Sequence, residues 1–109
     1  MCRSLIVLCV APTDDELKAL KRATVAADWE LAPGAIDARG ALDQIDAERP
    51  HMLVAFGPFE DVVALVAERY PGMRIVTDRD APGATVVAPS MAEVRDLLRS
   101  QARPGGPVL

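Results

Sequence analysis

The stretch MLVAFGPFEDVVALV, residues Met52–Val66, decides the fold of this chain. It opens with an uninterrupted apolar run to Phe56, which is typical of a strand covered on both faces of a sheet. Gly57 and Pro58 then break the run, and apolar residues from Val62 onward indicate a helix. The stretch therefore predicts a buried strand, a tight turn and a helix that packs back on the sheet. Phe56, at the carboxyl end of the strand, carries no reactive group.

The same alternation of apolar runs and amphipathic stretches continues over the rest of the chain. It predicts strands over residues 4–10, 29–32, 51–56, 73–77 and 85–88. It predicts helices from residue 13 to near residue 28, from 38 to before 50, from 60 to 70, and from 90 onward. Two of these helix starts, Thr13–Glu16 and Ser90–Glu93, have the spacing of a capping box. This order predicts an α/β fold with a mostly parallel sheet and helices on both faces.

Length, composition and charge limit the possible functions. The chain has 109 residues and half of them are apolar, as in ordinary globular domains. We expect one domain over residues 1–102 and a flexible tail over residues 103–109. The net charge of −4 argues against nucleic acid or an anionic membrane surface as a partner, because both need a concentrated basic patch. No apolar run approaches the roughly 18 residues of a membrane-spanning helix.

The cysteine and histidine content points to a reducing compartment and to no metal site. Cys2 and Cys9 are seven positions apart, so on an extended strand they lie on opposite faces and are not expected to pair. The single histidine, His51, cannot complete a zinc site with them. We therefore expect a cytoplasmic protein without a cofactor.

Chemistry in a parallel sheet is expected at the carboxyl ends of the strands. Cys9, near the end of the first strand, is either a buried structural thiol, which we favour, or a nucleophile with a lowered pKa. Asp14 and Asp15 fit the first turn of a helix better than a magnesium site. Thr77 places a hydroxyl at the end of the fourth strand, whereas His51 begins the third strand at the opposite edge.

The last predicted helix carries a regular row of arginines. Arg95, Arg99 and Arg103 are four residues apart and share one face of the helix. Such a row is commonly a solvated face, and the alternative is a basic surface for an acidic partner.

Three segments resemble the receiver domains of two-component response regulators. DARGALDQIDAERPHMLVAF (37–56) resembles the second helix and third strand of the family, and ERYPGMRIVT (68–77) resembles a fourth strand ending in its Thr, here Thr77. GATVVAPSMAEVRDLL (83–98) resembles the fifth strand, the Lys–Pro turn and the last helix, with Pro89 in place. The resemblance covers roughly residues 4–101. It implies a flavodoxin-like three-layer sandwich with a five-stranded sheet of order 2-1-3-4-5.

The sequence departs from this family where the family carries its chemistry. Cys9 and Val10 stand at the acidic metal-binding pair, and Phe56 stands at or beside the phosphorylated Asp. Ala88 replaces the Lys before Pro89. The resemblance therefore implies a degenerate receiver, or pseudo-receiver, which is not an enzyme and cannot form an acyl phosphate. It also implies a cis peptide bond between Ala88 and Pro89.

A pseudo-receiver is expected to act through its surface in signalling or transcriptional regulation. Such relatives dimerise or bind a protein partner by the face of the last strand and helix. Only DRDAPGA (78–84) separates the last two strands, so the fourth helix of the family is missing or replaced by a loop. We expect its loss to uncover apolar sheet surface. The candidate interaction face comprises Arg79, Asp80, Thr85, which stands where an aromatic switch residue is usual, Pro89, Arg95 and Arg99.

Two alternatives and one structural question stay open. LIVLCVAPTDDELKAL (5–20) with MLVAFGPFEDV (52–62) also resembles the phosphocysteine IIB domains of sugar phosphotransferase systems, with Cys9 as phosphate carrier. The glycine and hydroxyls expected after that cysteine are missing. A flavodoxin-like domain that binds a small ligand is the third possibility. The link between the last two strands is short for a parallel crossover, so an antiparallel fifth strand is also possible.

Overall fold

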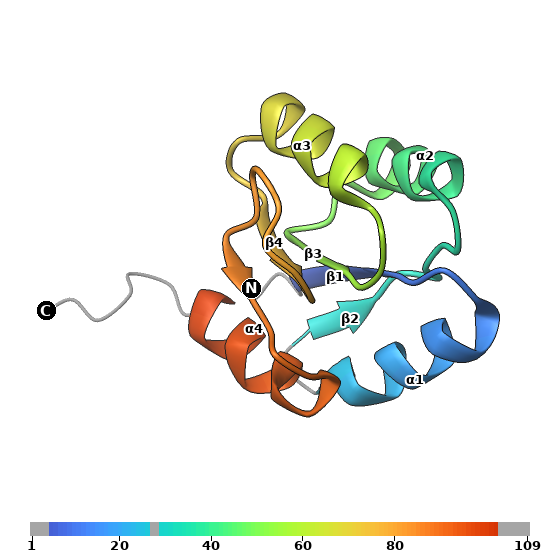
Figure 1. The fold of residues 1–109 in the computed structure, drawn as a ribbon, viewed down its shortest axis with the longest axis vertical. Helices are drawn as coiled ribbons and strands as arrows, with labels where there is room; N and C mark the ends of the chain where they lie inside the picture. The colour runs from blue at the N-terminus through green and yellow to red at the C-terminus, as the bar shows by residue number, and fades with distance from the viewer. Residues whose placement is uncertain (1–4, 27–28, 103–109) are drawn as a thin grey trace, which may run out of the picture.

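The computed structural model describes residues 5–26 and 29–102 (Figure 1). Five strands form one sheet: β1 (Leu5–Val10), β2 (Trp29–Leu31), β3 (Met52–Ala55), β4 (Arg74–Thr77) and β5 (Val86–Val87). The sheet order is β2-β1-β3-β4-β5, and every neighbouring pair is parallel. The predicted sheet and its order are confirmed, and the antiparallel alternative for β5 is wrong. The predicted tail, residues 103–109, lies outside the described residues.

Within these described ranges, four α-helices complete a three-layer sandwich. They are α1 (Asp14–Thr24), α2 (Ala38–Glu48), α3 (Glu60–Arg69) and α4 (Val94–Ala102), the last preceded by a 3₁₀ turn, η1 (Met91–Glu93). Helices α2 and α3 cover one face of the sheet, while α1 and α4 cover the other (Figure 1). None of the helices in the described ranges is long and apolar enough to cross a membrane.

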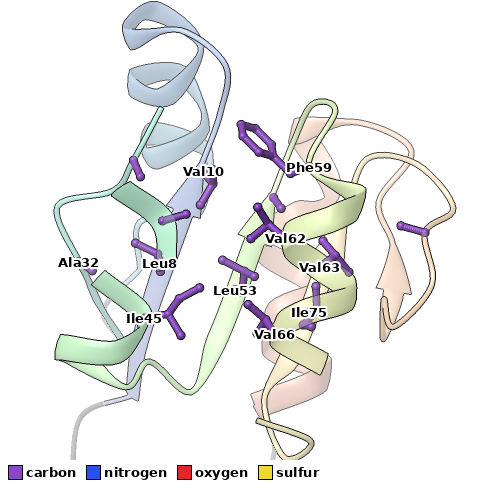
Figure 2. Close-up of a cluster of buried hydrophobic side chains, with 14 residues drawn as sticks. Leu8, Val10, Ala32, Ile45, Leu53, Phe59, Val62, Val63, Val66 and Ile75 are labelled. Atoms are coloured by element: carbon purple, nitrogen blue, oxygen red, sulfur yellow. The ribbon is translucent and has the colours of Figure 1, made fainter. Parts of the chain in front are cut away.

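Each face of the sheet has its own apolar core, as the predicted continuous apolar strands require. Successive strand residues point to opposite faces, so Leu53 packs toward α2 and α3 while Met52 and Val54 pack toward α1 and α4. In the core between the sheet and helices α2 and α3, strand residues pack against aliphatic side chains of these two helices (Figure 2). It includes Leu8, Ile45, Leu53, Val63, Val66 and Ile75.

The two predicted capping boxes have different outcomes. Thr13 caps α1, because its hydroxyl accepts a hydrogen bond from the Glu16 N–H at 3.2 Å. Ser90 makes no side-chain capping bond. Its carbonyl accepts the Glu93 N–H at 3.2 Å and starts the 3₁₀ turn instead. The second prediction is therefore right about where a helix begins and wrong about how it is capped.

Helix α1 ends earlier than predicted. The sequence pattern placed its end near residue 28, but the helix ends at Thr24 and Val25 is extended, with φ −57° and ψ 136°. The indole N–H of Trp29 donates to the Thr24 carbonyl at 2.9 Å, which satisfies a carbonyl freed by the end of the helix. A contact from the following strand thus helps to set the boundary.

A loop replaces a helix between β4 and β5, as predicted, and this loop covers the sheet. Ala81 is 8% exposed and belongs to the core under α3. Gly83, with φ +95°, lies so close to α3 that an added Cβ would be 2.6 Å from the Cβ of Ala67. The sequence predicted that apolar sheet surface would be uncovered here, and this prediction is wrong where the loop covers the sheet. On the β5 edge, Val87 is the exposed large apolar side chain among the described residues, at 39%.

Candidate functional site

The carboxyl ends of four strands form one row along an edge of the sheet. Val10 of β1 pairs with Ala55 of β3, Ala55 pairs with Thr77 of β4, and Thr77 pairs with Val87 of β5. This register brings the five predicted degenerate positions to the same edge of the sheet: Cys9, Val10, Phe56, Thr77 and Ala88.

These five residues belong to the interior of the protein. Phe56 is the most exposed of them, at 7%. Cys9, Phe56 and Ala88 are part of the core under α1 and α4, and Val10 is part of the core on the other face. Four of the five side chains offer no oxygen or nitrogen ligand. The row is therefore a packed, mostly apolar end of the sheet.

The turn after β3 closes over this edge. Gly57 has φ +117°, and an added Cβ there would lie 2.9 Å from Cδ of Pro12 and 3.2 Å from Cε2 of Phe59. Only glycine fits such a close approach at a positive φ. Phe59, which the sequence analysis did not single out, is buried and lies at the same end of the core as Val10 (Figure 2). Side chains thus fill the space beside the ends of β1 and β3.

Asp78 supplies a carboxylate at this edge. Its Oδ1 accepts hydrogen bonds from the Gly57 N–H at 3.2 Å and from Nε of Arg79 at 3.0 Å, while its Oδ2 accepts from Nη2 of Arg79 at 3.1 Å. Burial raises the pKa of this carboxyl, but the hydrogen bonds from Arg79 and Gly57 outweigh burial and lower the pKa overall. Asp78 is therefore an anion already bound by the protein. From the sequence, Asp78 was expected only in a polar loop, although its position directly after β4 is a signal for the carboxyl edge.

Thr77 uses its hydroxyl within the same turn. The side chain is 2% exposed, and Oγ1 donates to the carbonyl of Arg79 at 2.5 Å. The predicted hydroxyl is at the carboxyl edge, but it holds the backbone of the β4–β5 loop rather than facing solvent.

Cys9 is a buried thiol. Burial raises its pKa to about 11, against smaller lowering contributions from a hydrogen bond with Thr24 and from the charge of Lys21. A nucleophilic or phosphate-carrying cysteine needs the thiolate, and so a lowered pKa. The arrangement supports the structural interpretation of Cys9.

The two described arginines of the predicted row have different surroundings. Arg95 is partly buried, and its Nη2 donates to the carbonyl of Arg22 in the last turn of α1 at 3.2 Å, where a helix dipole favours a cation. Arg99 lies 3.9 Å from Asp96 and is 48% exposed in its side chain. Arg103 lies outside the described residues. Of these two residues, Arg95 therefore contacts the end of α1 and Arg99 is a surface arginine.

The other predicted interaction residues surround β5. Arg79 pairs with Asp78, and Asp80 is exposed beside it. Thr85 accepts the Ile75 N–H at 2.9 Å on its Oγ1, so it fixes the start of β5. Pro89 is exposed and its preceding peptide bond is trans, which corrects the implied cis bond.

The remaining candidates Asp14, Asp15 and His51 do not form a metal site among the described residues. Asp14 and Asp15 occupy the exposed first turn of α1, as predicted. His51 is at the amino edge, where its backbone N–H donates to Ile6 and its Nδ1 accepts the Ile6 N–H at 3.1 Å. Within residues 5–26 and 29–102, no three histidine, cysteine, aspartate or glutamate side chains group closely enough to hold a metal ion.

The solved structures to which this chain is similar include receiver domains. The signal receiver domain of the putative response regulator NarL from Mycobacterium tuberculosis has a TM-score of 0.75 and 16% identity, over 94% of this chain and 100% of that one. The signal receiver domain of an HD domain-containing protein from Pseudomonas fluorescens Pf-5 has a TM-score of 0.72 and 18% identity, over 89% of this chain and 93% of that one.

The response regulator domain of Thermotoga maritima CheB has a TM-score of 0.71 and 14% identity, over 91% of this chain and 93% of that one. No protein-family model and no curated protein matches the sequence. At these identities the comparisons concern the fold alone. The chain therefore has the flavodoxin-like fold of response-regulator receiver domains.

Proposed function

We propose that this chain is a receiver-like signalling domain that accepts no phosphoryl group and acts by contact with a protein. In this proposal it is not an enzyme, it needs no cofactor, and it works in the cytoplasm without binding nucleic acid or membrane. The observation that carries the proposal is the buried Phe56 at the carboxyl end of β3.

Phosphorylation of an aspartate needs three kinds of group at this edge. It needs a carboxylate nucleophile, acidic ligands for a divalent cation, and a cation to offset the phosphoryl charge. The strand ends present Phe56, Cys9, Val10 and Ala88 in these places, and each of them is buried. The nearby carboxylate of Asp78 is already bound by Gly57 and Arg79. These contacts support a domain without phosphotransfer chemistry.

Backbone NMR spectra with magnesium and beryllium fluoride, a mimic of an acyl phosphate, test this part of the proposal. We expect the amide signals of Gly57, Asp78 and Ala88 to be unchanged by the two additions. Saturable shifts at these amides would contradict the proposal. The variant Asp78→Asn then identifies the acceptor, because shifts that vanish in it would assign the acceptor to Asp78.

We propose a second copy of the chain as the partner, bound at the β5 edge. In the described part of the chain, β5 is the last strand on its side of the sheet, and Val87 is 39% exposed there. Near the strand end, Arg99 of α4, Asp80 and the Arg79–Asp78 pair supply polar groups for the rim of a contact, and the exposed Pro89 adds apolar surface. An isologous pairing of two such edges closes after two copies.

Sedimentation velocity at a series of concentrations tests this interface. We expect Val87→Lys to lower the dimer fraction, because it places a charge at the centre of the contact. The matched control is Ile36→Lys, since Ile36 has a similar exposure of 41% and lies before α2, away from β5. A wild-type protein that stays monomeric, or equal effects of the two variants, would contradict the homodimer without affecting the NMR result.

The phosphocysteine alternative gains no support. Cys9 is fully buried and its pKa is raised to about 11. A phosphate carrier would have to expose this thiol to its donor and acceptor.

A further inference from the structure

A pocket of about 540 Å³ opens at the amino edge of the sheet, opposite the edge described above. It lies where β1, β3 and β4 begin and where α2 and α3 end. Pro50 and Met52 line it and are both buried, and Leu5 and Met73 add further apolar surface. Its volume is in the range of pockets that bind small molecules.

The charged side chains that line this pocket are arginines. Arg49, Arg69 and Arg74 line it together with His51, and no acidic residue is among its described lining residues. Arg74 makes no ion pair with a carboxylate in the described part of the chain. This local excess of positive charge contrasts with the net charge of −4 for the whole chain. The charges of Arg49 and Arg74 therefore favour an anionic ligand, while the Asp46 carboxylate offsets part of the charge of Arg69.

Arg49 is held in an unusual backbone conformation. It is the one non-glycine residue with a positive φ among the described residues, at φ 49° and ψ 59°, in the left-handed position after α2 where glycine is usual. Its guanidinium carbon lies 5.8 Å from the centroid of the Tyr70 ring, within the range of a cation–π contact. A strained arginine at a pocket is the kind of feature that function, rather than stability, retains.

Neighbouring groups fix this arrangement. Asp46 of α2 accepts the Tyr70 hydroxyl at 2.6 Å on Oδ1, and its Oδ2 lies 3.6 Å from Nη1 of Arg69. His51 accepts the Ile6 N–H on Nδ1 at 3.1 Å, and this contact orients its ring at the pocket. Three arginines and one imidazole thus line the pocket together with the apolar residues Pro50 and Met52.

We propose that this amino-edge pocket binds a small organic anion that has a carboxylate or phosphate head and an apolar body. Arginine forks pair with both head groups through two parallel N–H···O bonds. The apolar body would cover Pro50 and Met52 and stack beside Tyr70. The site is independent of phosphotransfer and of the β5 edge, so its failure would leave the function proposed above unchanged.

NMR titration of the intact chain with 1-naphthoate, 1-naphthyl phosphate and neutral 1-naphthalenemethanol tests the proposal. We expect at least one anion to shift the amides of Gly72 and Arg74 in a saturable way, and the alcohol to bind about tenfold more weakly. The two anions distinguish a carboxylate site from a phosphate site. Equal binding of the alcohol, shifts elsewhere, or no saturable shift with either anion would overturn the proposal.

Variants separate a loss of the site from a loss of the fold. Arg74→Ala should weaken the binding of the tighter-binding anion about fivefold or more. The control Arg39→Ala removes an exposed arginine of α2 and should leave this binding unchanged. Arg49→Gly should weaken binding similarly but raise the melting temperature, because glycine relieves the left-handed strain. Unchanged binding in Arg74→Ala and Arg49→Gly would refute the assignment, and the melting temperatures exclude unfolding as the cause of a loss.

Discussion

The substitution Phe56→Ala tests whether the carboxyl end of β3 is a core position. Phe56 is 7% exposed and packs in the core under α1 and α4, so its removal leaves a cavity at the strand ends. Truncation of a buried phenylalanine costs about 3–5 kcal/mol. We expect the lower end, about 3 kcal/mol, because the site is at an edge of the sheet. A domain of this size has about 5–15 kcal/mol of unfolding free energy, so the loss is large.

Urea unfolding followed by the fluorescence of Trp29, the single tryptophan, measures this cost. With a slope of about 2 kcal/mol per molar urea, the midpoint should fall by about 1.5 M. Phe56→Leu should cost less, about 1 kcal/mol, because it keeps most of the apolar volume. Ile36→Ala serves as the control at a surface position, 41% exposed.

A cost below about 1 kcal/mol for Phe56→Ala would refute the reasoning. It would mean that the side chain is not part of the packed interior and that the end of β3 has room for other groups. The end of β3 would then not be the closed, packed position described above.

Three further predictions concern other described contacts. The pKa of Asp78 is lower in the folded protein than its ordinary 3.8, so its stabilising contribution is present above that pH and is lost as the pH falls through the folded value. The unfolding free energy of Asp78→Asn, measured by urea unfolding from pH 6 to 3, should therefore fall less steeply than that of the wild type. Gly83→Ala should lower the unfolding free energy by about 1–3 kcal/mol because of the positive φ of Gly83 and its contact with Ala67. The control Gly72→Ala should cost nothing, because an added Cβ there meets nothing within 4 Å. Equal effects of the two variants in a thermal melt would contradict this. In a Cys2→Ser variant, Cys9 should react with a disulfide reagent at pH 8 only as fast as the protein opens, and an immediate reaction would show an accessible thiolate.

Local patterns in the sequence predicted most of the fold. The run from Met52, its turn and its helix are all present, and the same pattern located the other strands. The errors arose where distant contacts decide a boundary. Trp29, in the next strand, caps the end of α1, and the sequence pattern of the helix does not predict that contact. Ser90 begins a 3₁₀ turn although its spacing to Glu93 also fits a capping box.

The edge residues were predictable because parallel strands end in one row. This rule placed Phe56 and Thr77 correctly, and the same rule applied to the residue after β4 would have found Asp78. The orientation of Arg95 toward α1 could not be predicted, because it depends on how two helices pack. The amino-edge pocket could not be predicted for a similar reason, since it forms between segments far apart in the chain.

The shortness of the two outer strands has a consequence for how this protein behaves in a crowded cell. Unpaired strand edges can recruit further strands without limit and so seed fibres. Here β5 has two residues and β2 has three, so each edge offers only a few backbone hydrogen bonds to an incoming chain. Strand addition alone is too weak to propagate. The sheet is thus protected from open-ended aggregation at both sides, and any lasting association must be specified by side chains.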